Sequence, residues 1–516
     1  MKAADIPLHY NAASILEHNV IHRPLKVGLY TQSDELTFSQ INTESNKVAN
    51  ALRKLGLRSG ETVAVLTTDS KEWVTAFFGV LKSGAIAAGL NTLLTAKDYE
   101  YILNDCGARI AFVHESILPK IKAIQTPFKK LEHIVVIGNH EPGTLGYESF
   151  IENESAEFET VSTHREDYAC LNYSSGTTGT PKGILHAHKD LPLTAQLWGV
   201  NVLGLTESDR TFALAKLFFT FGLGGNLIFP WYVGASTILY SGSPRDARSV
   251  LEVIDQKSPT IFYNVPTGYA SAMAIDNWTK EYDLSSLRLC VSAGEALPAP
   301  IWTQWKEQTG LDIIDGIGST ENFHIFLSNR PGDIRPGASG KPFPGYELKI
   351  VDEDGHEVHP GEIGNLMVKG ETSALGYLRD YEKSGRTFRG QWLFTGDKYY
   401  TDQDGYFWHA GRSDDMMKVG GIWVSPVEVE STILEHPAVF ECAVVPKRDP
   451  SDLVKPRAYI VVNEHYIPGS ELTETLLDYC SKKMAAYKRP RWVEYVRELP
   501  KTSTGKVQRY RLRQVA

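Results

Sequence analysis

Apolar residues recur at helical spacing near the start of the chain. Ile41, Val48 and Leu52 fall on one face of a helix predicted over residues 36–60, and Gly56 is a typical C-terminal stop. Such helices then alternate regularly with short apolar strands. The next predicted elements are helices at 73–82 and 96–105 and strands at 62–66, 84–90 and 109–113.

The alternation of helices and strands predicts a largely parallel sheet in an α/β fold. It continues through the middle of the chain. The elements expected there are strands at 167–172, 236–240, 260–265 and 288–292 and a helix at 247–256.

The pattern changes over residues 333–410, where short apolar segments are interrupted by Gly, Pro and Asp. This pattern of short apolar segments and turn residues favours β structure with tight turns. After Arg412 a small unit with two helices and two strands is predicted. The chain is therefore divided into domains at 1–413 and 414–516. The segments behind this division are strands at 347–351, 364–368, 406–408, 441–446 and 458–462 and helices at 426–434 and 471–484.

Composition narrows the function classes. Of 516 residues, 42% are hydrophobic and 22% charged, which is typical of a globular protein, and the net charge of −9 argues against nucleic acid as the main partner. The five cysteines are scattered without a CxxC pair, as expected of reduced thiols in a cytoplasmic protein. No signal-peptide pattern or apolar run of roughly 18–20 residues points to a membrane. The oligomeric state is left open, with a homodimer as one option.

Residues 173–183 read Tyr-Ser-Ser-Gly-Thr-Thr-Gly-Thr-Pro-Lys-Gly. Glycines let the backbone approach a ligand, and N–H groups and hydroxyls after a strand can bind phosphate oxygens. The segment is not a Walker A loop, since Gly183 rather than a hydroxyl residue follows Lys182. An ordinary solvated loop is the alternative.

Four further motifs follow in order: Gly-Ile-Gly-Ser-Thr-Glu at 316–321, Phe-Thr-Gly-Asp at 394–397, Gly-Arg-Ser-Asp-Asp at 411–415 and Pro-Lys-Thr-Ser-Thr-Gly-Lys at 500–506. With the 173–183 segment they resemble the motifs of the adenylate-forming superfamily of acyl-CoA synthetases. The resemblance spans the chain from about residue 35 to its end. It implies a large N-terminal domain of two α/β subdomains and a β-rich subdomain, followed by a small mobile α+β domain. The 411–415 motif resembles the hinge between these two domains, which implies a hinge at Asp414.

The resemblance also implies ATP, Mg²⁺ and coenzyme A as ligands. A carboxylate suits Mg²⁺ at Glu321, and Asp397 can accept both ribose hydroxyls. Lys506 would stabilise charge that develops during adenylation. The motif-matched nucleotide positions are Ser174, Ser175, Gly176, Thr177, Thr178, Lys182, Asp315, Gly316, Thr320, Asp397 and Arg412, with Lys506, Glu321 and Thr178 as the catalytic set.

Coenzyme A is expected near the domain boundary. Gly420 and Gly421 would allow its pantetheine arm to pass close to the backbone. A basic patch of Lys455, Arg457, Lys488 and Arg489 is a candidate for its nucleotide end, with a solvated charge cluster as the alternative.

A narrower resemblance is to the benzoate–CoA ligase branch, carried by Lys-Leu-Phe-Phe-Thr-Phe-Gly-Leu-Gly at 216–224 and the segment 318–332. This resemblance implies a pocket for the aryl group that is lined by aromatic and small residues, and such a pocket suits a flat ring. Threonine and phenylalanine at 220–221 depart from the usual Ala-Tyr and resemble ligases for 2-aminobenzoate. The pocket residues implied are Phe219, Thr220, Phe221, Ala293, Gly318, His324 and Ile325.

The predicted function is an ATP-dependent aryl–CoA ligase for benzoate or a small substituted benzoate, acting through an aryl-AMP intermediate. One alternative is a 2-aminobenzoate–CoA ligase, and another is an aryl-AMP ligase that loads a carrier protein. A catalytically silent binding protein is disfavoured because both Lys506 and Glu321 are present.

Overall fold

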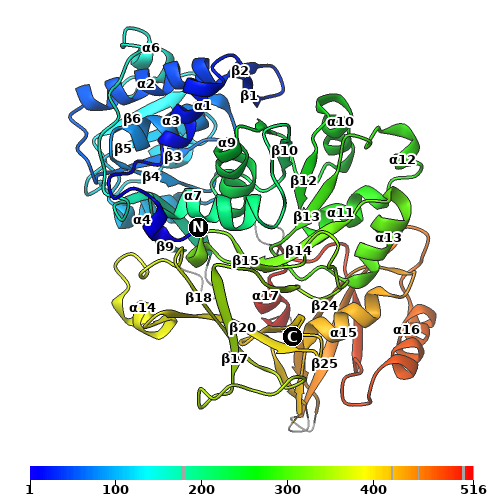
Figure 1. Ribbon diagram of the computed structural model, residues 1–516. Helices are drawn as coiled ribbons and strands as arrows, with labels where there is room; N and C mark the ends of the chain where they lie inside the picture. The colour runs from blue at the N-terminus through cyan, green and yellow to red at the C-terminus, as the bar shows by residue number, and fades with distance from the viewer. Residues whose placement is uncertain (176–180, 420–421, 451–452, 502–505, 515–516) are drawn as a thin grey trace.

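The computed structural model describes residues 1–516 except 176–180, 420–421, 451–452, 502–505 and 515–516 (Figure 1). Its N-terminal part contains two large sheets, and a β-rich layer and a small C-terminal domain lie beside them (Figure 1). This arrangement is the predicted fold: a large α/β domain with a β-rich subdomain and a small C-terminal domain. No helix among the described residues is long and apolar enough to span a membrane.

The first large sheet has seven strands in the order β7-β6-β5-β3-β4-β8-β9. Its central strands are parallel and β3 is buried throughout, as expected of a sheet covered by helices on both faces. The elements are β3 (Thr62–Leu66), β4 (Ile86–Gly89), β5 (Ile110–His114), β6 (His133–Ile137), β7 (Leu145–Gly146), β8 (Tyr168–Ser175), β9 (Pro181–Ala187), and helices α2 (Phe38–Lys54), α3 (Lys71–Lys82), α4 (Ala96–Cys106), α5 (Leu118–Lys122) and α6 (Tyr147–Ile151).

The helix predicted over 36–60 is too long at both ends. Residues Glu35–Thr37 form β2, and the Thr37 hydroxyl caps α2 by accepting from Gln40 N. The helix ends at Lys54, and Gly56 then adopts φ +73°, a left-handed conformation that glycine tolerates.

The second large sheet has nine strands in the order β16-β15-β14-β13-β12-β10-β11-β1-β2. Strands β10 to β14 are parallel where they pair, whereas β15 returns antiparallel to β14 after the short 3-10 turn η4 (Thr320–Asn322). The elements are β1 (Val27–Tyr30), β2 (Glu35–Thr37), β10 (Arg210–Ala213), β11 (Ser236–Ile238), β12 (Ile261–Asn264), β13 (Leu289–Ser292), β14 (Ile313–Gly318), β15 (Ile325–Ser328), β16 (Lys341–Pro342), and helices α1 (Ser14–His22), α10 (Ala247–Lys257), α11 (Pro266–Met273), α12 (Trp278–Glu281) and α13 (Ala299–Thr309).

A helical layer lies between the two large sheets (Figure 1). Its second part runs from Thr220 to Val233 and widens into a π-helical turn at Gly224–Ile228. Such turns are often found at functional sites. The layer consists of α7 (Asp190–Thr194), η2 (Ala195–Val200), α8 (Thr220–Leu223), η3 (Gly224–Ile228) and α9 (Phe229–Val233).

The β-rich layer and the C-terminal domain complete the chain. Strand β21 ends at Arg412 and β22 begins at Met417, so Asp414 lies in the short connection between them. The elements are β17 (Tyr346–Val351), β18 (Gly364–Gly370), α14 (Tyr381–Thr387), β19 (Phe388–Arg389), β20 (Trp392–Thr401), β21 (Phe407–Arg412), then β22 (Met417–Val419), β23 (Ile422–Val424), α15 (Pro426–Leu434), β24 (Val439–Arg448), β25 (Val454–Val462), α16 (Ser470–Lys483), β26 (Trp492–Tyr495) and α17 (Arg509–Gln514).

Candidate active site

The Gly/Thr-rich segment connects two antiparallel strands. Strand β8 ends at Ser175 and β9 begins at Pro181, with Ser174 opposite Lys182. Lys182 therefore belongs to a strand and not to the phosphate-binding loop that the sequence predicts. The expected phosphate-binding residues Gly176, Thr177 and Thr178 lie outside the described residues.

Glu321 lies in the η4 turn between β14 and β15. Its Oε1 accepts a hydrogen bond from Tyr377 Oη at 2.8 Å. The backbone beside Tyr377 is fixed to β9, since Leu378 N donates to Gly183 O at 2.8 Å. The Lys182 ammonium lies 5.3 Å from the centroid of the Tyr377 ring. Tyr377, which the sequence motifs did not single out, thus connects the carboxylate of Glu321 to the strand that follows the phosphate segment.

A second lysine lies beside Lys182. Burial and then the neighbouring Lys383 ammonium lower the pKa of Lys182 to about 8, while Glu321 acts in the opposite direction. Lys383 belongs to α14 and lies outside all five motifs. Two adjacent half-buried ammonium groups form a site that suits a polyanion, because an anion would relieve their repulsion.

Asp397 and Arg412 face each other on adjacent strands β20 and β21. Arg412 Nη1 lies 3.0 Å and His409 Nε2 lies 3.6 Å from Asp397 Oδ1. Burial alone would raise the pKa of Asp397, but Arg412 and then His409 hold it at about 2. The carboxylate is therefore ionised at neutral pH and can accept hydrogen bonds from vicinal hydroxyls.

The 315–320 motif occupies the end of β14 and the turn after it. Burial raises the pKa of Asp315 to about 8, and its Oδ1 has no hydrogen-bond partner among the described residues. A Cβ at Gly316 would lie 2.9 Å from Leu327 O, so a side chain there would displace β15. The Thr320 carbonyl accepts from His186 Nε2.

Lys506 lies near the N-terminal domain. The adjacent Val507 N donates to Glu295 Oε1 at 2.8 Å, and a Cβ at Gly294 would lie 3.9 Å from Lys506 Cε. The Lys506 side chain is solvent-exposed, yet surrounding protein atoms and then Arg412 lower its pKa. Asp397, Glu295 and Glu321 act in the opposite direction. The structure thus brings Lys506 into the same charged group as Arg412, Asp397 and Glu321. The docking contact of Glu295 was not anticipated from the sequence.

His324, a predicted aryl-pocket residue, is surrounded by aromatic rings. His324 is buried, and its ring centroid lies 5.4 Å from Phe221, 4.6 Å from Phe229 and 5.0 Å from Trp198. Burial lowers the pKa of His324 to about 3, so the imidazole is neutral at pH 7. Phe229 and Trp198 were not predicted, because only the folded helical layer brings them to this ring.

The other expected pocket positions lie at the start of α8 and at the ends of the adjacent strands β13, β14 and β15. Thr220 is buried at the start of α8, directly after the half-buried Phe219. Ala293 follows β13, and Ile325 begins β15. A Cβ at Gly318 would lie 2.6 Å from His324 O, so only glycine lets the backbones approach this closely.

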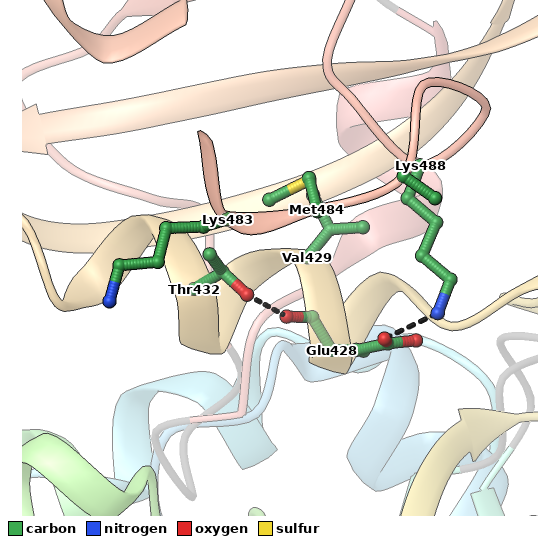
Figure 2. A pocket seen from close by; sticks show the side chains of 7 residues that line it. Glu428, Val429, Thr432, Lys483, Met484 and Lys488 are labelled. Carbon is green, nitrogen blue, oxygen red and sulfur yellow. Dashed lines mark hydrogen bonds and ion pairs between the residues drawn. The ribbon is translucent and has the colours of Figure 1, made fainter. Parts of the chain in front are cut away.

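The basic patch expected for coenzyme A is on the C-terminal domain. Lys488 forms an ion pair with Glu428 beside a cavity of about 170 Å³ (Figure 2). Arg489 donates to Met484 O and Ser481 O, each at 3.0 Å. Lys455 is half-buried on β25. Arg457 is buried and donates to Glu494 and to Leu512 O, so its assignment to an exposed patch is wrong. The expected glycines 420–421 lie outside the described residues.

Comparison with known families identifies the chain. A model described as "AMP-binding enzyme" matches residues 16–378, and one described as "AMP-binding enzyme C-terminal domain" matches residues 428–506. The chain belongs to the AMP-binding enzyme family. It is 44% identical to a benzoate–CoA ligase of Thauera aromatica, over 99% of this chain and 97% of that protein. It is 37% identical to a 4-hydroxybenzoate–CoA/benzoate–CoA ligase of Rhodopseudomonas palustris, over 98% and 94%.

Two solved structures of this family are similar along the whole chain. The anthranilate CoA ligase AuaEII in complex with anthranoyl-AMP superposes with a TM-score of 0.97 and 62% identity, covering 99% of this chain and 98% of that one. A benzoate CoA ligase from Burkholderia xenovorans gives a TM-score of 0.91 and 37% identity, with 98% and 100% covered. This member of the AMP-binding enzyme family is therefore an AMP-forming aryl–CoA ligase that uses ATP and coenzyme A.

Proposed function

We propose that this aryl–CoA ligase activates 2-aminobenzoate and also accepts benzoate. The observation that carries the proposal is the 62% identity to the anthranilate (2-aminobenzoate) CoA ligase, against 44%, 37% and 37% to the three ligases that activate benzoate. A threonine and a phenylalanine at positions 220–221, instead of the Ala-Tyr usual in benzoate ligases, support the same choice.

The polar atoms of the aryl pocket support an amino-substituted ring. His324 Nε2 lies 3.2 Å from Phe221 O, and since a carbonyl only accepts, the neutral imidazole carries its proton on Nε2. His324 Nδ1 is then an acceptor, and it has no partner among the described residues. An amino group can donate to such a lone pair, whereas benzoate leaves it unsatisfied. The Thr220 hydroxyl is a second group that can bond to a small ortho substituent.

The charged residues support adenylation as the first step. The carboxylate of the acid attacks the α-phosphorus of ATP, the bond to the β-phosphate oxygen breaks, and pyrophosphate leaves. Lys506 and Arg412 stabilise the negative charge that develops, and Asp397 holds the ribose. The Glu321 carboxylate has the hard oxygen donors that Mg²⁺ prefers, and bound Mg²⁺ would neutralise phosphate charge. Lys182 and Lys383 hold the pyrophosphate portion.

The second step requires no nucleophilic side chain from the protein. The coenzyme A thiolate attacks the acyl carbon of aryl-AMP, AMP leaves, and a thioester forms. We propose that rotation of the C-terminal domain about Asp414 withdraws Lys506 between the two steps. The basic residues Lys455, Lys488 and Arg489 are the proposed contacts for the nucleotide end of coenzyme A.

A substrate series tests the proposal. The kcat/KM for 2-aminobenzoate, benzoate, 2-fluorobenzoate and 4-aminobenzoate is measured with ATP, Mg²⁺ and coenzyme A for the natural protein and for Thr220→Ala. We expect 2-aminobenzoate to be preferred and the para isomer to be poor. Thr220→Ala should widen acceptance by about 10–200-fold for the disfavoured rings, the range expected of one methyl-sized change. A preference for benzoate over 2-aminobenzoate would refute the assignment of the acid.

An aryl-AMP ligase that loads a carrier protein would share the first step. Thioester formation with free coenzyme A separates the two functions, because a carrier-loading enzyme would release aryl-AMP without forming the free thioester.

A further inference from the structure

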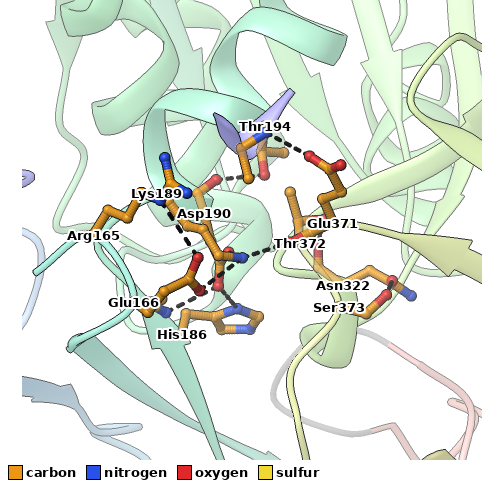
Figure 3. Close-up of polar contacts among 12 residues, drawn as sticks. Arg165, Glu166, His186, Lys189, Asp190, Thr194, Asn322, Glu371, Thr372 and Ser373 are labelled. Carbon is orange, nitrogen blue, oxygen red and sulfur yellow. Dashed lines mark hydrogen bonds and ion pairs between the residues drawn. The ribbon is translucent and has the colours of Figure 1, made fainter. Parts of the chain in front are cut away.

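A buried histidine connects the strand after the phosphate segment to the turn that carries Glu321. His186 lies near the end of β9, and its side chain is fully buried. Its Nε2 lies 2.7 Å from the carbonyl oxygen of Thr320, the residue directly before Glu321. Its Nδ1 lies 3.1 Å from Asp190 Oδ2 (Figure 3).

The partners determine which atoms donate. A backbone carbonyl can only accept, so His186 Nε2 must carry a proton and donate to Thr320 O. The Asp190 carboxylate also accepts from Ala187 N at 2.9 Å and from Lys189 Nζ at 3.1 Å. Lys189 Nζ in turn donates to Glu371 O at 2.8 Å. His186 is therefore held in one orientation by a network that extends from β9 to the β-rich layer.

The turn that His186 contacts is strained. Phe323, which ends η4, has φ +68°, a left-handed conformation that is uncommon for a bulky residue. Such conformations persist where surrounding contacts fix them. The Phe323 ring packs edge-on against His186, with centroids 5.2 Å apart. On the other side, Ser373 Oγ donates to Asn322 Oδ1 at 2.7 Å (Figure 3).

We propose that His186 is a positioning residue for the metal site: its hydrogen bond to the Thr320 carbonyl fixes the Glu321 carboxylate relative to the phosphate segment. The inference rests on the proposed role of Glu321 as the Mg²⁺ ligand. His186 touches neither substrate nor metal. It acts by keeping two parts of the ATP site, which are more than a hundred residues apart in sequence, in one geometry.

A pair of substitutions of similar size separates the hydrogen bond from packing. Glutamine at position 186 can donate to Thr320 O, whereas methionine fills similar volume without a donor. Affinity for Mn²⁺, a stand-in for Mg²⁺, is measured by electron paramagnetic resonance with the full chain and the non-cleavable analogue α,β-methylene-ATP. Loss of a partner that orients a ligand typically costs 10–100-fold in metal affinity, so His186→Met should weaken Mn²⁺ binding by about that factor. His186→Gln should stay within about threefold of the natural protein, by the same reasoning.

His188 is the matched control. It is equally buried two residues further along, but its Nδ1 accepts from Ala12 N at 3.0 Å and so holds the N-terminal segment. His188→Met should lower the melting temperature and leave Mn²⁺ affinity unchanged. The KM for the aryl acid and the rate of thioester formation from preformed aryl-AMP should not change in the variants at positions 186 and 188.

Glu321→Gln distinguishes a failure of the role proposed for His186 from a failure of the metal assignment of Glu321. If it weakens Mn²⁺ binding while His186→Met does not, the positioning role is refuted and the metal ligand stands. If Glu321→Gln itself leaves Mn²⁺ affinity unchanged, the metal assignment and the role of His186 are refuted together. Equal losses of Mn²⁺ affinity in His186→Met and His188→Met would show a packing effect and would also overturn the proposal.

Discussion

Arg412 Nη1 lies 3.0 Å from Asp397 Oδ1, and the two residues are directly opposite in the β20–β21 ladder. The pair is positioned by backbone register and not by a flexible loop. One side of the Asp397 carboxylate is thus oriented before any nucleotide binds, which reduces the ordering that binding requires.

The stability contributed by Asp397 should depend on pH. Its pKa in the folded protein, about 2, is below the ordinary value of 3.8. A depressed acid pKa stabilises the fold above pH 3.8, and this contribution is lost as the pH falls towards 2. Melting temperatures of the natural protein and Asp397→Asn should therefore differ most near neutral pH and converge between about pH 4 and 2. A difference that is constant over this range would contradict the interpretation.

Lys506→Ala should abolish adenylation and spare the second step. Removing a group that stabilises developing charge typically lowers the rate by about 10²–10³. Aryl-acid-dependent pyrophosphate exchange measures the first step, and thioester formation from preformed aryl-AMP measures the second. Equal damage to both would exclude the assignment.

Asp414→Pro should impair thioester formation more than pyrophosphate exchange. Proline fixes φ near −65° and also restricts the preceding residue, which would hinder rotation at the connection between β21 and β22. The same two half-reaction assays apply, and normal rates in both would show that the hinge lies elsewhere.

Neutralising Lys488 and Arg489 together should raise the KM for coenzyme A and leave the KM for ATP unchanged. The double change to glutamine keeps most of the aliphatic length of both side chains. Because Lys488 is paired with Glu428, we also expect Glu428→Gln to free the lysine and lower the KM for coenzyme A. An unchanged KM in both variants would remove this patch from the site.

Lys383→Gln should weaken pyrophosphate binding. In the reverse reaction, which forms ATP from aryl-AMP and pyrophosphate, the KM for pyrophosphate should rise while that for aryl-AMP does not. Loss of one charge-assisted hydrogen bond costs about 1.5–3 kcal/mol, or roughly 10–100-fold. Arg386→Gln is the control, since Arg386 lies on the same helix and pairs with Glu382 on the surface. Lys383→Arg, which keeps the positive charge, should retain binding if charge is what matters.

Local patterns predicted the strands and helices well where apolar residues mark buried elements. Strands β3 and β5 and helices α3 and α4 are close to their expected bounds, because short unbroken apolar runs mark buried strands and longer apolar segments mark buried helices. The N-terminal error at α2 has a tertiary cause. Residues Glu35–Thr37 pair with β1, and no pattern within the helix reports that pairing.

The site was predictable where its residues lie in contiguous motifs. Lys506, Asp397 and Glu321 were singled out by short segments, and the structure places them in one charged group. Tyr377, Lys383 and Glu295 were missed because each is a single residue of a common type. These residues reach the site only when distant segments fold against β9 and the loop after β13. A single sequence carries no signal for such contacts.

The π-helical turn at Gly224–Ile228 sets the rotation of the helix before it relative to the helix after it. A turn of this kind contains one residue more than an α-helical turn, and removing that residue would rotate the helix before it by about 100° relative to the helix after it. Thr220, a predicted pocket residue, would then move although no side chain had been substituted. The position of the predicted aryl-pocket residues thus depends partly on the number of residues in this turn, so a single-residue deletion within it would change the pocket that we propose.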